Sequence, residues 1–235
     1  MRYFERRISD YFNRFLSNLI KINQTIHLHI DQSLVWHYSD NSIKLPNLLK
    51  IKLIFYSKES STIKKFLSEC MPDQLEVFVF RFNPVSPHTT DILPYMASLC
   101  KCLSGVTQQV YFYSVDFNSS HTLSKIVKAS HNAESVIIRR GKVLTDDEWD
   151  FWNDNNYKTK TLSFSTGDVS SICEWKNHSK RWINIVKGIS NCGLKNALQI
   201  VGINPGDISK KDAQKVLTEY GCQDICIKET YEVQM

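Results

Sequence analysis

Two short groupings of side chains have the composition of a metal site. His27 and His29 are two residues apart in a strand-like stretch, so their side chains would point the same way and could hold one ion. Cys100 and Cys102 have the same separation in a helix-like stretch, where residues two apart face different directions. No third ligand lies near the histidines. We therefore expect polar surface histidines, cysteines that pack as small apolar residues, and neither a metal nor a cofactor.

The sequence also lacks the loops that common enzyme classes use for catalysis. It contains neither a G-x-x-x-x-G-K phosphate loop, nor G-x-G-x-x-G after a strand, nor a G-x-S-x-G nucleophile elbow. The acidic run Asp146–Glu148 follows Thr145 with capping-box spacing, so the start of a helix accounts for it. An enzyme on an ordinary α/β domain is thus the least favoured of three functional hypotheses, and we expect a non-enzymatic protein.

Composition bounds the class of protein further. The chain has 235 residues, 42% of them apolar, which suffices for a continuous core, and a net charge of +5, which alone does not imply nucleic acid. No apolar run is long enough to predict a membrane span. The seven cysteines are odd in number and no secretory signal precedes them, which favours reduced thiols in a cytoplasmic protein.

Any functional side chain must be positioned by a series of short apolar strands. These strands recur every 25 to 36 residues, and a helix-like stretch follows each. Such self-similarity is typical of repeat proteins, and a strand–helix–strand series at this spacing predicts parallel strands. The predicted strand centres are Ile26, Ile51, Val77, Val110, Val136, Leu162, Leu198 and Ile225.

Helix signals lie between these strands and before the first. Residues 1–23 predict an amphipathic helix that caps the first repeat, with a presequence or membrane-surface helix as the alternative. Later helices have identifiable ends: Gly105 stops one, and Ser209 opens another that stops at Gly221. Insertions near 84–90 and 167–179 would account for the two longest steps. No linker interrupts the series, so residues 24–235 are predicted to form one domain.

The spacing and strand character resemble those of leucine-rich-repeat proteins of the helix-containing, ribonuclease-inhibitor-like kind. Leu48-x-x-Ile51-x-Leu53 matches the start of that family's L-x-x-L-x-L-x-x-N pattern, and 198–208 has its loop character. The resemblance implies a right-handed strand–helix solenoid, with a curved parallel sheet inside, helices outside, and protein binding on the concave sheet. The family's asparagine is missing from the expected positions, which hold Tyr56, Phe82, Val115, Gly141 and Gly167. A doubly wound α/β domain is the alternative architecture.

The candidate functional residues follow from the strand pattern. In most triplets the outer residues are apolar, so they would face the helices and the middle residues would face the other way. Aromatic residues beside arginine are typical of binding hot spots. This reasoning predicts a partner-binding patch made of Lys52, Phe78, Phe80, Tyr111, Tyr113 and Arg139.

Three functional hypotheses are open. The favoured function is that of a scaffold or adaptor that binds a partner protein through the patch. The second is binding of RNA or an anionic surface by its cations and rings, and the third is the enzyme discussed above. Alternatively, the patch is no site at all, because the N-terminal helix or an insertion covers it.

Overall fold

The computed structural model describes residues 26–31, 48–56, 60–82, 90–117, 120–141, 157–166, 175–191, 193–203 and 208–229, together with Arg14 and Asn18. Arg14 and Asn18 are helical and exposed, and the rest of the predicted capping helix lies outside the described residues. The acidic run Asp146–Glu148 also lies outside them, as does most of each predicted insertion.

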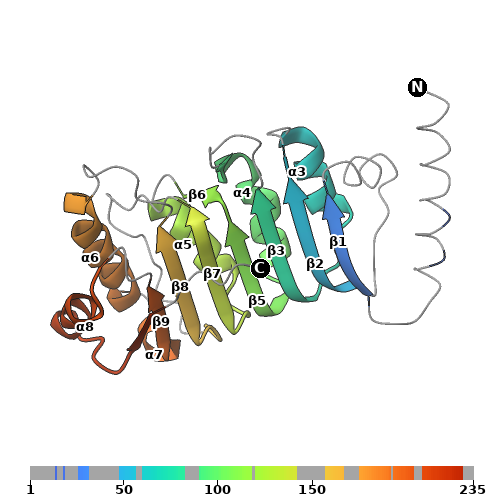
Figure 1. Cartoon of the computed structure of the whole chain (residues 1–235). Helices are drawn as coiled ribbons and strands as arrows, with labels where there is room; N and C mark the ends of the chain where they lie inside the picture. The colour runs from blue at the N-terminus through green and yellow to red at the C-terminus, as the bar shows by residue number, and fades with distance from the viewer. Residues whose placement is uncertain are drawn as a thin grey trace.

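Eight strands of the described chain form a single sheet in which all neighbours are parallel (Figure 1). They are β1 (Ile26–Asp31), β2 (Leu48–Phe55), β3 (Leu75–Phe82), β5 (Val106–Tyr113), β7 (Ser135–Gly141), β8 (Thr161–Thr166), β9 (Ile200–Ile203) and β10 (Cys226–Glu229). The predicted strands at Ile26, Ile51, Val77, Val110, Val136 and Leu162 are confirmed, whereas Leu198 and Ile225 lie just before β9 and β10.

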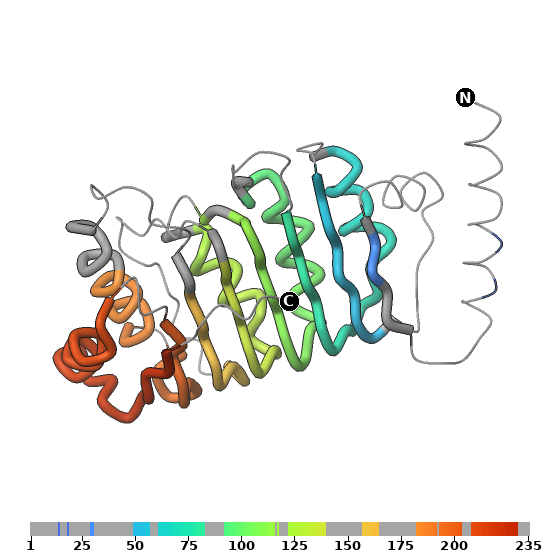
Figure 2. Tube along the Cα trace, in the orientation of Figure 1, coloured from blue at the N-terminus to red at the C-terminus, as the bar shows by residue number. Residues whose placement is uncertain are grey.

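The strands are arranged in the sheet in the order in which they occur in the chain. The spatial order is β1-β2-β3-β5-β7-β8-β9-β10, and the same succession can be followed along the tube in Figure 2. A doubly wound sheet reverses its strand order at a switch point, and these eight strands contain no reversal. A small parallel pair, β4 (Thr90–Asp91) with β6 (Val115–Asp116), lies outside this sheet.

Helices alternate with the strands as predicted. Behind the sheet in Figure 1 lie α3, α4 and α5, with α4 packed between the other two. At the β8–β10 end, α6 packs against α7 and α8. The helix bounds are α3 Ser60–Glu69, the 3₁₀ turn η1 Leu93–Tyr95, α4 Met96–Leu103, α5 Ser120–Ala129, α6 Trp175–Asn191, α7 Leu194–Ala197 and α8 Lys210–Glu219.

Several helix ends agree with the sequence signals. Ser209 caps α8, because its Oγ accepts a hydrogen bond of 3.1 Å from the backbone N–H of Asp212. Gly221 follows that helix with φ of 70°, a conformation in which a side chain is strained. Gly105 is required for space instead, because a Cβ there would overlap the backbone carbonyl oxygen of Asp73. The turn between α4 and β5 therefore packs directly onto the turn before β3.

The hydrophobic core lies between the sheet and the helices. Alternate strand residues point into it, and helices α3, α4 and α5 close it with residues such as Phe66, Leu99 and Ile126. One core row crosses six strands in register and consists of Ile51, Phe78, Val110, Val136, Leu162 and Val201. Because this row is fully apolar, it fixes which side chains of each strand point away from the helices.

Candidate functional site

The side of the sheet away from the helices carries the candidate site. Within the described residues, no helix lies in front of β2, β3, β5 and β7 in Figure 1. We call this side the front face. Its partly exposed members on these four strands include Lys50, Lys52, Val77, Val79, Arg81, Gln109, Tyr111, Tyr113, Ser135, Ile137 and Arg139. Ile54, which is paired with Arg81, lies on the same side and is buried.

Strand register arranges the front face in rows that cross the sheet. Lys52 is paired with Val79, Val79 with Tyr111, and Tyr111 with Ile137. The adjacent row runs from Asp31 on β1 through Ile54, Arg81 and Tyr113 to Arg139. Neighbouring strands are about 4.8 Å apart, so consecutive members of a row can touch. Four of the six predicted site residues, Lys52, Tyr111, Tyr113 and Arg139, therefore lie together on one face.

The predicted positions of Phe78 and Phe80 are wrong. Phe78 is 0% exposed and Phe80 is 1% exposed, and both pack in the core. The ring of Phe80 lies 5.0 Å from that of Phe55 and 5.9 Å from that of Tyr95, centroid to centroid. Helices α3 and α4 cover these rings, so neither phenylalanine can contact a partner.

A shift of one residue in the alternation of β3 explains this error. Residues two apart face the same side of a strand, and all four residues from Val77 to Phe80 are apolar, so that stretch does not reveal its buried side. The register with Val110 places Phe78 in the core row. Arg81 was the residue that sequence reasoning missed. The sequence signal is that Arg81 is charged and stands between Phe80 and Phe82. A charged residue rarely faces the core, so Arg81 and the other odd-numbered residues of β3 are expected on the front face.

The front face has a defined centre where Arg81 lies over Tyr113. The guanidinium carbon of Arg81 is 4.5 Å from the centroid of the Tyr113 ring, which is cation–π geometry. Tyr113 in turn stacks on Tyr111, with centroids 6.4 Å apart and 15° between the ring planes. These contacts join a cation from β3 to two rings from β5, so we call Arg81, Tyr111 and Tyr113 the front-face stack.

The turn after β5 fixes the end of the row that contains Tyr113. The backbone N–H of Ser114 donates a 2.9 Å hydrogen bond to the carbonyl oxygen of Arg139, which extends the pairing of β5 with β7. Ser114 then adopts φ of 56°, a left-handed conformation that is uncommon for residues other than glycine. The chain bends there, so that Val115 and Phe117 enter the core while Tyr113 stays on the front.

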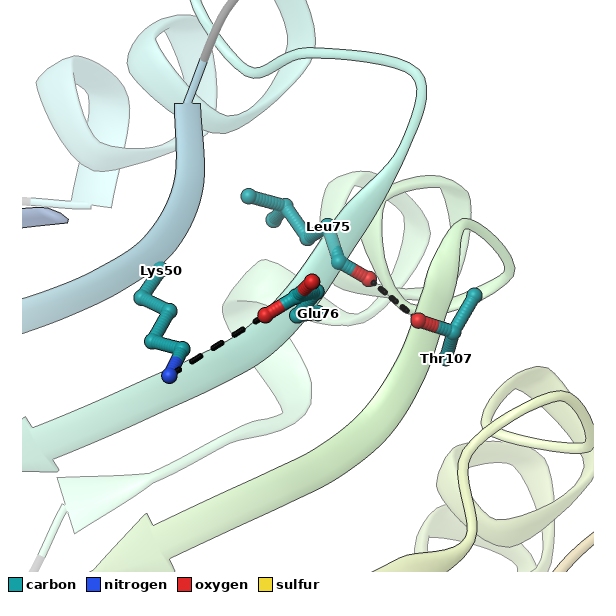
Figure 3. Close-up of polar contacts among 4 residues, drawn as sticks. All are labelled: Lys50, Leu75, Glu76 and Thr107. Atoms are coloured by element: carbon teal, nitrogen blue, oxygen red, sulfur yellow. Dashed lines mark hydrogen bonds and ion pairs between the residues drawn. The ribbon is translucent and has the colours of Figure 1, made fainter. Parts of the chain in front are cut away.

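At the other end of these strands, polar contacts tie β2, β3 and β5 together (Figure 3). Lys50 Nζ lies 4.0 Å from a carboxylate oxygen of Glu76, and Thr107 Oγ1 donates a 3.3 Å hydrogen bond to the carbonyl oxygen of Leu75. The Lys50–Glu76 pair is partly exposed and contributes less than about 1 kcal/mol to stability. The pair places the carboxylate of Glu76, at the edge of the front face, against one particular lysine.

The front face changes character beyond β7. The row that contains Tyr111 and Ile137 continues into Ser163 on β8 and Gly202 on β9. Ser163 is only 3% exposed, and within the described part of the chain its Oγ has no hydrogen-bond partner. Along this row, the large, partly exposed side chains of β5 and β7 thus give way to small, buried residues on β8 and β9.

The two cysteines considered as metal ligands, Cys100 and Cys102, make separate contacts. Cys102 Sγ donates to the Leu67 carbonyl oxygen at 2.9 Å, and burial raises the pKa of this thiol to about 12. Cys100 Sγ lies instead 3.7 Å from Met96 Sδ. Cys70 and Cys222 are buried as predicted, and Cys192, for which the same was predicted, lies outside the described residues. Cys102 is buried as well, and His29 is exposed. No group of three metal-ligating side chains occurs among the residues that the structure describes.

Two findings complete the description of the chain. Comparison with protein-family models, with curated proteins and with solved structures found no match. Among the helices of the described ranges, none has the length and hydropathy of a membrane-spanning segment.

Proposed function

We propose that this chain is a non-enzymatic interaction protein that binds a partner protein through the front face of its sheet. The observation that supports this best is the front-face stack, in which a guanidinium and two tyrosine rings are held in contact on a partly exposed face. Arginine and tyrosine are enriched at binding hot spots, because they offer large contact area together with polar groups. Lys52 and Arg139 flank the stack and complete the patch.

Pre-ordering of these side chains supports the same function. A binding site loses affinity when flexible side chains must be immobilised on association. Here the ring of Tyr113 already restrains Arg81, and Tyr111 restrains the ring of Tyr113. Part of the side-chain conformational entropy is therefore already lost on folding, so less is lost when a partner binds.

We further propose that the architecture is a short leucine-rich-repeat-like solenoid with an N-terminal cap. The sequential strand order and the row of helices behind β1 to β7 support this, because a solenoid stacks each repeat only on its neighbours. Such proteins bind partners on their extended sheet surface. A cytoplasmic location belongs to the same proposal, and it is supported by five described cysteines that are all free thiols.

The test compares two variants that each remove one cation–π pair. Arg81→Gln with Tyr113→Ala removes the pair on the front face, and Lys187→Gln with Tyr220→Ala removes a pair between α6 and α8, where Lys187 Nζ is 5.8 Å from the ring centroid. Each protein is used to capture partners from its native cell by crosslinking and affinity purification. Circular dichroism and thermal unfolding establish that both variants fold.

We expect the front-face variant to lose the proteins that the wild type enriches, and the control variant to retain them. Equal retention by both folded variants would contradict a partner site on the front face. Loss in the α6–α8 variant alone would place the partner surface on the helical side of the molecule instead.

A further inference from the structure

We infer that three lysines on the helical side of the molecule bind the surface of an anionic phospholipid membrane. They are Lys65 on α3, Lys101 on α4 and Lys125 on α5, and we call them the lysine row. The three helices lie behind the sheet in Figure 1, on the side opposite the front face. Binding through the lysine row therefore does not depend on the partner site proposed above.

Each lysine of the row is on the outer surface of its helix. All three are exposed, and two buried residues follow each of them directly. These pairs are Phe66–Leu67, Cys102–Leu103 and Ile126–Val127. Another buried residue lies two positions before each lysine, namely Ile63, Leu99 or Leu123. With 3.6 residues per helical turn, these buried residues occupy the core side of each helix, and the lysine occupies the opposite side.

Contacts between the helices place the three lysines side by side. Lys101 Nζ donates a long hydrogen bond of 3.5 Å to the carbonyl oxygen of Ser68, one turn beyond Lys65 on α3. On the other side of α4, Cys100 Sγ lies 3.9 Å from the carbonyl oxygen of Lys125. Packed helices are about 8–10 Å apart, so the lysine row spans about 20 Å. An ammonium group has three donors, so Lys101 can also face an anion.

Positive charge predominates on these three helices. The sequences of α4 and α5 contain no carboxylate, and that of α3 contains one, Glu69, at its last residue. Glu69 has interactions of its own, and so does Lys128, a further cation on α5. The ion pairs among the described residues do not involve the lysine row. A surface that complements the row must therefore be negative.

The neighbours of the lysines favour a lipid surface over a protein or a nucleic acid. Exposed residues beside the row are small: Ser61, Ser68, Ala97 and Ser104. Protein hot spots are rich in tryptophan, tyrosine and arginine, and unpaired bases stack on aromatic rings. Within the described parts of α3, α4 and α5, none of these side chains is exposed. An anionic bilayer needs only charge, because each lysine near its surface adds to the attraction.

The arrangement of the helices suits a broad surface as the partner. Helices α3, α4 and α5 lie next to one another in one layer, with α4 packed against both neighbours. Lysine side chains are long and flexible, so the three ammonium groups can reach a planar bilayer together. A molecule bound in this way turns its front face away from the lipid, where a partner protein can reach it.

The experiment measures co-sedimentation of the full chain with lipid vesicles. Vesicles of phosphatidylcholine alone are compared with vesicles that also contain phosphatidylserine. The row variant carries Lys65→Gln, Lys101→Gln and Lys125→Gln. The control variant loses the same charge elsewhere, through Lys158→Gln, Lys210→Gln and Lys228→Gln, which replace exposed lysines outside α3, α4 and α5. Circular dichroism establishes that both variants fold.

We expect the wild type to bind the vesicles that contain phosphatidylserine and not the others, with affinity that falls as salt rises. The row variant should bind about 100-fold more weakly, because each lysine near an anionic surface contributes about fivefold. The control variant should lose less than about fivefold. If the row variant does not fold, Lys101→Gln alone replaces it, with an expected loss of about fivefold.

Three results would overturn the inference: no binding to either kind of vesicle at low salt, equal binding to both kinds, or equal losses in the row and control variants. The last result would mean that net charge, and not the lysine row, attracts the protein to lipid. A DNA duplex serves as the competing polyanion. Tighter binding of the duplex than of the vesicles, lost only in the row variant, would assign the row to nucleic acid instead.

Discussion

The two faces of β3 and β5 use aromatic side chains in opposite ways. On the back, Phe78, Phe80 and Phe112 lie within 6.4 Å of one another, centroid to centroid, and are fully enclosed by the helices. On the front, Tyr111 and Tyr113 stack beside Arg81 and stay partly exposed. The difference teaches that residues one position apart on the same strand can be divided between the hydrophobic core and a partly exposed surface, which we propose serves recognition.

The largest effect on stability is expected when Phe80→Ala is compared with Val79→Ala. The two residues are neighbours on β3 and face opposite sides of the sheet. Phe80→Ala should lower the free energy of unfolding by about 3–5 kcal/mol, because it removes a buried ring and leaves a cavity. Val79→Ala should cost less than about 1.5 kcal/mol, since Val79 is only half-buried. Denaturant unfolding of both variants measures the contrast, and similar losses would show that the two faces do not differ as described.

A second test uses pH to examine the helix layer behind the back face. Burial raises the pKa of Cys102 to about 12 from an ordinary value of 9.0, so the folded state keeps a proton that the unfolded state loses. Stability is therefore unaffected below pH 9 and falls as pH rises from 9 towards 12. Between pH 9 and 10.5 the wild type should lose about 1.5 kcal/mol more than Cys102→Ala does.

The same pair of proteins at pH 7 supplies the control for this measurement, because any packing effect of the substitution is present there as well. Parallel stability curves for the two proteins up to pH 10.5 would mean that Cys102 is more accessible to water than its position in α4 indicates.

A smaller effect is expected on the front face. Tyr113→Leu keeps the apolar bulk and removes the ring that faces the Arg81 guanidinium. The variant should lose about 0.5–1 kcal/mol of unfolding free energy, the range for a partly exposed cation–π contact. A loss as large as that of Phe80→Ala, measured under the same conditions, would make the front-face stack part of the structural core.

The smallest expected effect concerns the part of the front face that crosses β8. Ser163 is buried, and its hydroxyl finds no hydrogen-bond partner within the described ranges. Ser163→Ala should leave stability unchanged or raise it by up to about 1 kcal/mol, because an unsatisfied buried hydroxyl is costly. Thermal unfolding would detect the change, and a marked loss of stability would show that the hydroxyl does have a partner.

The positions of the strands could be predicted well because strand residues are rich in β-branched and aromatic types and recur at regular intervals. Strands β9 and β10 were placed slightly early, since Leu198 and Ile225 are buried core residues that lie just outside the paired segments. A buried residue is apolar whether or not its backbone is hydrogen-bonded to a neighbouring strand, so hydrophobicity does not mark where a strand begins. Element boundaries were therefore less predictable than the elements themselves.

The candidate site was predictable only where polar residues mark the strand alternation. Lys52 stands between the apolar residues Ile51 and Leu53, and Arg139 follows the apolar Ile138, so the outward direction of β2 and β7 is evident from sequence. On β3 the apolar residues alternate between valine and phenylalanine, and hydrophobicity does not separate them. Only packing against the helices decides that the larger rings go inside. The contact of Arg81 with Tyr113 depends on the register between two strands, which no single strand encodes.

The sequential strand order has a consequence for how the protein is made. Each strand of the large sheet pairs only with the strands that come immediately before and after it in that sheet along the chain. On a ribosome, every strand therefore emerges after one of its partners is already present, and no segment has to wait for a distant part of the chain. Contacts of this kind keep loop-closure costs low. The sheet can thus grow in the direction of translation, with each new strand adding to the edge formed by the strand before it.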